Sequence, residues 1–132
     1  MKSFSMKTLA TAVALAALSG SAFAAGDAGS GEKVFAKCKA CHQVGETAKS
    51  GIAPVLNGVD GRAAGSVAGY NYSDAMKSSG ITWNEASFLE FIKNPKAKVP
   101  GTKMVYQGLS SDKEAGDVWA YLASFGADGK KK

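Results

Sequence analysis

Residues 37–43 read KCKACHQ and place two thiols and one imidazole within five positions of the chain. These side chains belong to Cys38, Cys41 and His42, and the full sequence of 132 residues contains no other cysteine and no other histidine. Thiolates and imidazoles bind metals, and thiols also form covalent bonds. Three kinds of site are therefore open to this motif: a redox dithiol, a zinc site and a haem attachment site.

A redox dithiol opens a helix that follows a strand, because the helix dipole lowers the thiol pKa. Here the motif ends a helical pattern, and no strand pattern precedes it. A zinc site needs a fourth ligand, which no second Cys or His pair supplies and for which a carboxylate would be a weak substitute. Haem attachment would use all three residues of the motif: Cys38 and Cys41 would form thioether bonds to the porphyrin, and His42 would bind the iron. The motif favours one covalently attached haem c.

The iron of such a haem has a second axial position, and methionine is a candidate for it. Two of the four methionines, Met1 and Met6, lie in an N-terminal segment that we expect to be removed. We expect the Met76 side chain to fill space in the hydrophobic core. Met104 ends the sequence PGTKM, whose turn residues can hold a side chain at fixed geometry. We expect His42 and Met104 to be the metal ligands; an iron left open would instead suit a small haem enzyme or sensor.

The N-terminus has the three parts of a secretory signal peptide. Lys2 and Lys7 make it basic, residues 9–18 are apolar apart from Thr11, and small residues stand at 22 and 24. The apolar run is shorter than the ~18 residues that a membrane helix needs. We expect cleavage after Ala24, which leaves residues 25–132 as one exported domain in the periplasm, without stable membrane insertion.

The charge balance is mildly basic. The chain has 16 Lys and Arg against 11 Asp and Glu, and removing Lys2 and Lys7 with the signal peptide leaves 14 against 11, or +3. This lacks the dense basic footprint of a nucleic-acid binder. Two cysteines in an oxidising compartment would ordinarily form a disulfide, so an exported thiol-disulfide oxidoreductase is the alternative if no haem is bound.

The pattern of the remaining chain predicts an all-α fold in which long loops separate the helices. Apolar periodicity and capping signals predict helices at 27–39, from near 73, at 84–94 and from 111 to 126. Pro95 should stop the third of them. The glycine-rich loop at 43–70 is long enough to wrap a bound group, and a second loop spans 96–109. The tail from about residue 127 is expected to be mobile.

The chain resembles the class I c-type cytochromes, including mitochondrial cytochrome c and its short periplasmic bacterial relatives. Four segments carry the resemblance by their order and spacing: GEKVFAKCKACH, GYNYSDAMK, NPKAKVPGTKM and DVWAYL. The likeness covers almost all of residues 25–132. It implies a small cytochrome c fold, in which Gly31 and Phe35 of the first helix pack against Tyr121 of the last. It also implies that the long loops wrap a covalently bound haem.

The resemblance further assigns roles around the haem. The backbone carbonyl of Pro54 would accept a hydrogen bond from the His42 ring, and Thr102 would order the loop before the methionine ligand. The haem propionates would be hydrogen-bonded by Arg62, Tyr72 and Trp83. From the residues alone, the two aromatic side chains could equally be plain core residues, and the arginine a solvated charge.

Two positions depart from the family pattern. Phe91 stands where a tyrosine often lies near the methionine sulfur, so a hydrogen bond to that sulfur should be absent. Tyr106 stands where a phenylalanine usually lies beside the haem edge. Both changes are expected to affect the redox potential.

The resemblance implies a carrier of single electrons rather than an enzyme, exchanging electrons with respiratory, dehydrogenase or photosynthetic complexes. Its partners would be acidic-faced redox proteins that bind transiently to a monomer. Six lysines flank the two haem-binding loops in sequence and could steer such partners: Lys37, Lys39, Lys49, Lys96, Lys98 and Lys103. Any single one of them could also be a solvated surface charge.

Overall fold

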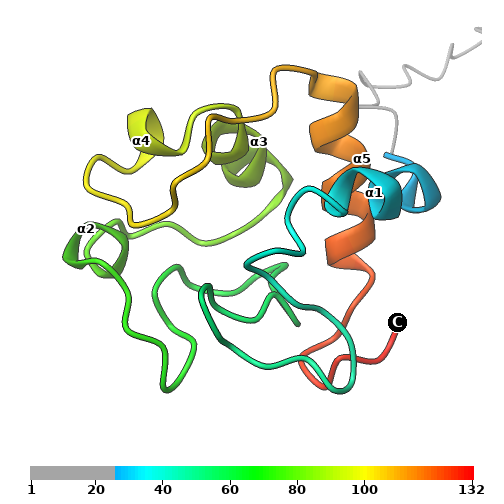
Figure 1. Cartoon of the computed structure of the whole chain (residues 1–132), viewed down its shortest axis with the longest axis horizontal. Coiled ribbons are helices and arrows are strands. Elements are labelled where there is room, and N and C mark those ends of the chain that lie inside the picture. Colours follow the sequence, from blue (N-terminus) through cyan, green and yellow to red (C-terminus); the bar gives the residue numbers. More distant parts are fainter. Residues whose placement is uncertain (1–25) are drawn as a thin grey trace, which may run out of the picture.

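The computed structural model describes residues 26–132, so the predicted signal peptide at 1–24 lies outside the described residues. Five helices occur in this part of the chain, connected by long loops (Figure 1). They are α1 (Ala28–Phe35), α2 (Asp74–Lys77), α3 (Glu85–Lys93), α4 (Pro95–Lys98) and α5 (Asp112–Ala123). Within residues 26–132 the only β pairing is two isolated bridges, so the prediction of an all-α fold is confirmed.

The first and last helices cross at very short range (Figure 1). A Cβ atom added to Gly31 would lie 1.9 Å from the carbonyl oxygen of Asp117, so only glycine lets the backbones approach this closely. One turn further on, the rings of Phe35 and Tyr121 lie with their centroids 5.5 Å apart. The expected packing of the terminal helices is thus present.

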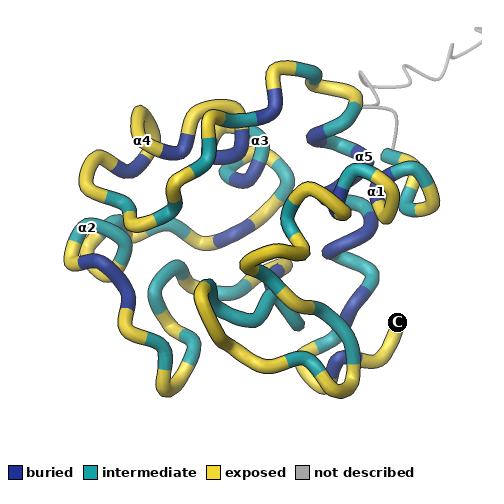
Figure 2. Tube along the Cα trace, viewed as in Figure 1, coloured by how far each residue is buried: buried dark blue, intermediate teal, exposed yellow. Residues whose placement is uncertain are grey.

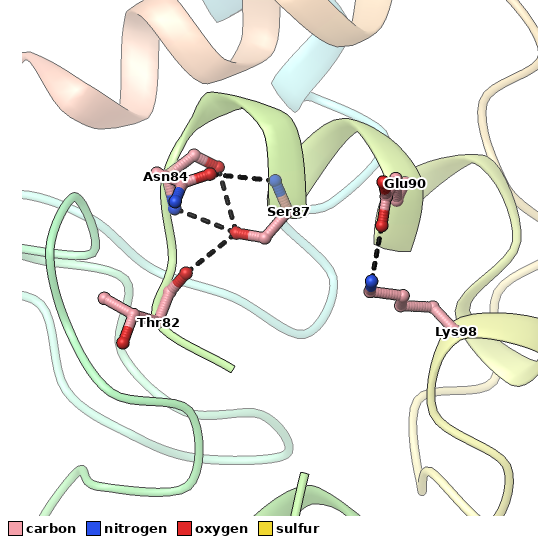
Figure 3. A network of polar contacts seen from close by, with 5 residues as sticks. All are labelled: Thr82, Asn84, Ser87, Glu90 and Lys98. Carbon is pink, nitrogen blue, oxygen red and sulfur yellow. Dashed lines mark hydrogen bonds and ion pairs between the residues drawn. The ribbon is translucent and has the colours of Figure 1, made fainter. Parts of the chain in front are cut away.

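Local capping explains where α3 begins. The Asn84 side chain accepts from the Ser87 amide at 2.9 Å, and the Ser87 hydroxyl accepts from the Asn84 amide at 2.9 Å, which makes a reciprocal capping box (Figure 3). The hydroxyl of Ser87 also donates to the Thr82 carbonyl. These bonds fix the entry of α3, which packs on α5 through Phe88 and Trp119, with ring centroids 5.2 Å apart.

Two helix boundaries differ from the sequence prediction, and one further helix is present. The first helix ends at Phe35 rather than near residue 39, because the segment that carries the two cysteines continues as turns. Pro95 does stop α3, but it also occupies the first turn of α4, a helix that the sequence analysis placed in a loop. Lys98 of α4 forms an ion pair with Glu90 of α3 (Figure 3). The last helix ends at Ala123 rather than near residue 126.

The C-terminal tail was expected to be mobile from about residue 127, whereas the structure folds it back on the chain. The Gly126 amide donates to the Lys130 carbonyl at 2.9 Å, and the Lys132 amide donates to the Ser124 carbonyl at 2.8 Å. Gly129 is buried. The tail returns beside the loop that follows the CxxCH motif (Figure 1).

The core lies where α1, α3 and α5 meet, and the loops below it are mostly half-buried or exposed (Figure 2). Val118 and Leu122 of α5 are almost fully buried against Phe35. No helix among residues 26–132 has the length and apolar character needed to cross a membrane. The packed helices form one side of the molecule, and the two long loops lie beside them.

Candidate functional site

The loops and helices enclose a largely apolar cavity of about 470 Å³. Its lining includes every side chain that the sequence analysis selected for cofactor or metal binding. These are Cys38, Cys41, His42, Pro54, Arg62, Tyr72, Trp83, Thr102 and Met104. Residues separated by up to 66 positions in sequence are thus brought to one cavity, which is what the binding of a single large cofactor requires.

The CxxCH segment forms one wall of the cavity. Its turns are closed by backbone bonds from the amides of Cys41 and His42 to the Cys38 carbonyl, at 3.1 and 2.9 Å. Cys38 is half-buried and Cys41 is exposed. Burial raises the pKa of the Cys38 thiol, which is the opposite of the lowered thiol pKa that a redox dithiol uses. Residues 26–132 also contain no cluster of three or more His, Cys, Asp or Glu that could hold a metal ion, as the zinc alternative would need.

The His42 ring is oriented by the loop that follows it. Its Nδ1 lies 2.9 Å from the carbonyl oxygen of Pro54, the bond that the family resemblance led us to expect. With Nδ1 donating to this carbonyl, Nε2 keeps its lone pair for a metal. Burial lowers the pKa of His42 below its ordinary value and so favours the neutral ring; the hydrogen bond to Pro54 opposes this shift, and the nearby Arg62 charge adds to it. A neutral, oriented imidazole is the form that binds iron.

Two methionines line the cavity rather than one. Met104 and Met76 are both partly buried against the core cluster. The Met104 amide donates to the Thr102 hydroxyl at 3.2 Å, a local bond in the loop that carries Met104. Met76 lies in α2, whose first turn is capped by Ser73. The sequence analysis treated Met76 only as a filler and missed its place in the lining.

Arg62 has an incomplete set of hydrogen bonds. Its Nη1 donates to the carbonyls of Val55 at 2.9 Å and Asn57 at 3.0 Å. Its Nε is buried and has no hydrogen-bond partner among residues 26–132. A buried, unpartnered donor on a cationic group needs an acceptor, and a carboxylate facing the cavity would supply it. Arg62 is therefore not a solvated charge, and the cavity fits a cofactor that carries an acidic group.

The two aromatic residues selected from the sequence are also core residues. Tyr72 and Trp83 are both buried. The Tyr72 hydroxyl accepts from the Val67 amide at 3.1 Å and still has its own proton to donate. The Trp83 ring contacts Phe91 with centroids 5.1 Å apart. The plain core role and the cofactor-binding role are thus compatible at these positions.

Both departures from the family pattern lie in the cavity wall. Phe91 is buried there, and its ring has no hydroxyl to offer to a methionine sulfur. Tyr106 lines the wall beside Cys38, and burial raises the pKa of its hydroxyl. Val105, between Met104 and Tyr106, also lines the cavity and is 90% exposed.

The six lysines selected as a steering surface differ in their contacts. Lys37 and Lys103 line the cavity. Lys37 lies 3.8 Å from Glu114, and the Lys103 ammonium donates to the Asn71 carbonyl at 3.2 Å. Lys98 pairs with Glu90. All six are exposed, and no contact of this kind involves the remaining three within residues 26–132: Lys39, Lys49 and Lys96.

Sequence reasoning missed Asn57, whose side chain closes the loop after the motif. Its Oδ1 accepts from the Gly45 amide at 2.9 Å, and its Nδ2 donates to the Gly45 carbonyl at 2.8 Å. The Asn57-Gly58 pair is a turn signal that could have marked this position. The partner at Gly45, twelve residues away, has no signal in the sequence.

Comparison with known proteins agrees with this geometry. A family model described as Cytochrome c matches residues 28–126. The chain is 67% identical to cytochrome c-554 of Methylosinus trichosporium over 132 residues, which is the whole of both chains. It is 57% identical to cytochrome c-550 of Nitrobacter winogradskyi over 107 residues, covering 81% of this chain and 98% of that protein.

A solved structure has the same fold. Cytochrome cH from Methylobacterium extorquens superposes with a TM-score of 0.70 at 51% identity, covering 74% of this chain and 97% of that one. The chain therefore belongs to the cytochrome c family: it is an electron-transfer protein rather than an enzyme, and it carries haem c bound covalently through Cys38 and Cys41.

Proposed function

We propose that this cytochrome is a periplasmic one-electron carrier in which His42 and Met104 are the axial ligands of the haem iron. The observation that carries the proposal is that both side chains line the same cavity, with the His42 ring already oriented by the Pro54 carbonyl. The chemistry that haem c supplies is the gain and loss of one electron at iron. The protein's part is to fill both axial positions and to surround them with apolar groups.

The cavity wall favours the reduced state. A thioether ligand and an apolar surrounding both raise the reduction potential of a haem, because they stabilise the less charged ferrous form. Phe91, Met76 and Val59 contribute apolar surface to this wall. Arg62 would pair with a haem propionate through its free Nε, and Tyr72 and Trp83 would donate to the propionates. Thr102 would hold Met104 in place through the Met104 amide.

The ligand assignment is tested by two matched substitutions in the haem-loaded protein. Met104→Ala should lower the midpoint potential and allow carbon monoxide to bind the ferrous protein. Met76→Ala removes the same side chain from another part of the lining and should leave carbon monoxide excluded. If Met104→Ala excludes carbon monoxide as the wild type does, Met104 is not a ligand, and carbon monoxide binding by Met76→Ala would transfer the role to Met76.

The partners that suit this surface are acidic redox proteins that bind briefly to a monomer. Lys37 and Lys103 at the cavity, with the exposed Lys39 and Lys49, place positive charge on the CxxCH segment and on the two loops that close the site. Complementary charge speeds encounter without requiring a tight complex. Such partners include respiratory, dehydrogenase and photosynthetic complexes. Gel filtration of the haem-loaded protein should give a monomer.

Export accounts for the first 24 residues, which we propose to be a cleaved signal peptide preceding the domain at 25–132. The basic start, the apolar run and the small residues at 22 and 24 support this assignment. The intact mass of the protein recovered from the periplasm should correspond to residues 25–132 plus one haem. A mass that includes residues 1–24 would contradict the proposal.

A further inference from the structure

The C-terminal segment 126–132 folds into a strap against the loop that orients His42. A Cβ atom added to Gly129 would lie 2.2 Å from the Gly45 carbonyl oxygen and 2.7 Å from the Glu46 amide nitrogen. Gly129 also has a φ of +79°, which residues with a Cβ rarely adopt. The backbones of residues 129 and 45 are therefore in direct contact, and the sequence at 129 is limited to glycine for two separate reasons.

The strap makes a second contact with the same loop. A Cβ atom added to Gly58 would lie 2.9 Å from the Cα of Ala127. Gly45 and Gly58 belong to the two sides of one closed loop, because Asn57 binds both the amide and the carbonyl of Gly45. The strap thus contacts both sides of the loop at the end where Asn57 joins them.

From that end, successive bonds lead to the histidine. After the Asn57–Gly45 pair, the Leu56 amide donates to the Gln43 carbonyl at 3.1 Å. Next comes the bond between His42 Nδ1 and the Pro54 carbonyl at 2.9 Å. These three hydrogen-bonded links join residues 42–45 to residues 54–57 at successive positions. A displacement at Gly45 or Asn57 would therefore be transmitted to the carbonyl that orients the His42 ring.

The other end of the strap is fixed to the helical core. The Lys132 amide donates to the Ser124 carbonyl, and residues Phe125 and Lys131 form an isolated bridge. The Lys131 ammonium lies 5.7 Å from the centroid of the Phe125 ring and 6.0 Å from that of Tyr121, within the range of a cation–π contact. Tyr121 packs on Phe35 of α1. The strap therefore connects the packed terminal helices to the histidine loop.

We propose that Gly129 is a positioning residue: through Gly45 and Asn57, the 126–132 strap holds the Pro54 carbonyl against His42 and so sets the electron donation of the imidazole. This inference rests on His42 being an axial ligand, as proposed above. A hydrogen bond at Nδ1 makes an imidazole a stronger electron donor. Stronger donation stabilises ferric iron, so loosening the strap should raise the midpoint potential.

The test compares Gly129→Ala with Gly51→Ala in the haem-loaded protein. Gly51 belongs to the same loop, but a Cβ atom there would meet nothing within 4 Å, so its substitution controls for the change in residue type. Gly129→Ala should speed amide exchange at Gly45 and Leu56 by roughly tenfold, because the loop opens locally. It should also raise the midpoint potential. Gly51→Ala should match the wild type in both measurements.

A chain ending after Phe125 tests the same idea without introducing strain. It should show the same faster exchange and the same direction of potential shift as Gly129→Ala. If both variants lose thermal stability but keep wild-type exchange at Gly45 and Leu56 and a wild-type potential, the strap only anchors the terminus and the proposal is overturned. The ligand assignment is tested separately by carbon monoxide binding to Met104→Ala, so failure of one does not imply failure of the other.

Discussion

At the scale of single residues, Arg62 links the loop after the motif to the cavity. Its Nη1 donates to two loop carbonyls, those of Val55 and Asn57, while the buried Nε has no hydrogen-bond partner among residues 26–132, and the residue lines the cavity. The same side chain therefore supports the loop and prepares the site for an acidic cofactor. Arg62 thus binds the backbone carbonyl of the residue whose side chain closes the loop at Gly45.

Replacing Arg62 by alanine should destabilise the haem-loaded protein. The substitution leaves the Val55 and Asn57 carbonyls without this donor. Because both bonds are partly buried, each loss costs at most the ~1–3 kcal/mol of a fully buried unpaired group. Denaturant unfolding followed by haem absorbance measures the loss. Arg62→Lys keeps the charge but cannot reproduce the fork of donors, so it should recover only part of the stability. An Arg62→Ala protein as stable as the wild type would show that these bonds are unimportant.

Asp117 predicts a pH dependence of stability. A hydrogen bond from Lys113 at 2.7 Å and one from the Asp27 amide at 2.8 Å lower the pKa of this carboxyl below its ordinary value of 3.8. The folded protein thus binds the proton less readily than the unfolded chain. The stabilisation from Asp117 is complete above pH 3.8 and is lost as the pH falls through the lower folded pKa.

Asp117→Asn should therefore be less stable than the wild type at pH 7, and the difference should shrink as the solution is acidified. Urea unfolding at a series of pH values measures this directly. A gap between the two proteins that stays constant down to the acid limit would contradict the assigned pKa shift.

At the scale of elements, the crossing of α1 and α5 predicts a large effect of one methyl group. Gly31→Ala would place a Cβ atom 1.9 Å from the Asp117 carbonyl oxygen, so the helices must separate, at a cost of about 1–3 kcal/mol or more. Gly29→Ala is the matched control in the same helix. Its Cβ would meet only the Asp27 side chain at 3.5 Å, so it should be neutral or slightly stabilising. Equal thermal stabilities of the two variants would contradict the account.

The elements that the sequence could predict are those set by local chemistry. The Asn84 and Ser111 caps and the stop at Pro95 mark helix ends because the bonds involved span only three or four residues. α4 was missed because a proline was read only as an end, whereas it also suits the first turn of a new helix. The folded-back tail depends on contacts between residues 129 and 45, which no local pattern records.

In the candidate site, too, the features set by local sequence could be predicted and those set by long-range contacts could not. Cys38, Cys41 and His42 could be found from spacing alone, and the family resemblance supplied the Pro54 contact that the structure contains. Asn57, and the place of Met76 in the cavity lining, could not be found this way, since both depend on how distant loop segments meet.

At the scale of the whole molecule, residues 25–132 have 14 Lys and Arg against 11 Asp and Glu, a net charge of +3, and two lysines line the cavity. This charge predicts how ionic strength affects the rate of electron transfer. Oxidation of the ferrous protein by ferricyanide, an anion, should slow as ionic strength rises, because salt screens the attraction. Oxidation by a cationic cobalt complex should accelerate under the same conditions.

A single lysine can be tested in the same assay. Lys37→Gln should weaken the salt dependence of the rate of oxidation by ferricyanide more than Lys33→Gln does, since Lys37 lines the cavity and Lys33 does not. Identical salt slopes for an anionic and a cationic oxidant would contradict steering by the protein's charge.

The central claim is that one iron lies between His42 and Met104 in the cavity. The proton NMR spectrum of the reduced protein, with its methionine methyl groups labelled with carbon-13, tests it most directly. An axial methionine methyl sits over the porphyrin face, where the ring current shifts its resonance far upfield. We predict one such three-proton signal, which Met104→Ala removes and Met76→Ala leaves in place. A spectrum without this signal, or a signal that survives in Met104→Ala, would contradict the account.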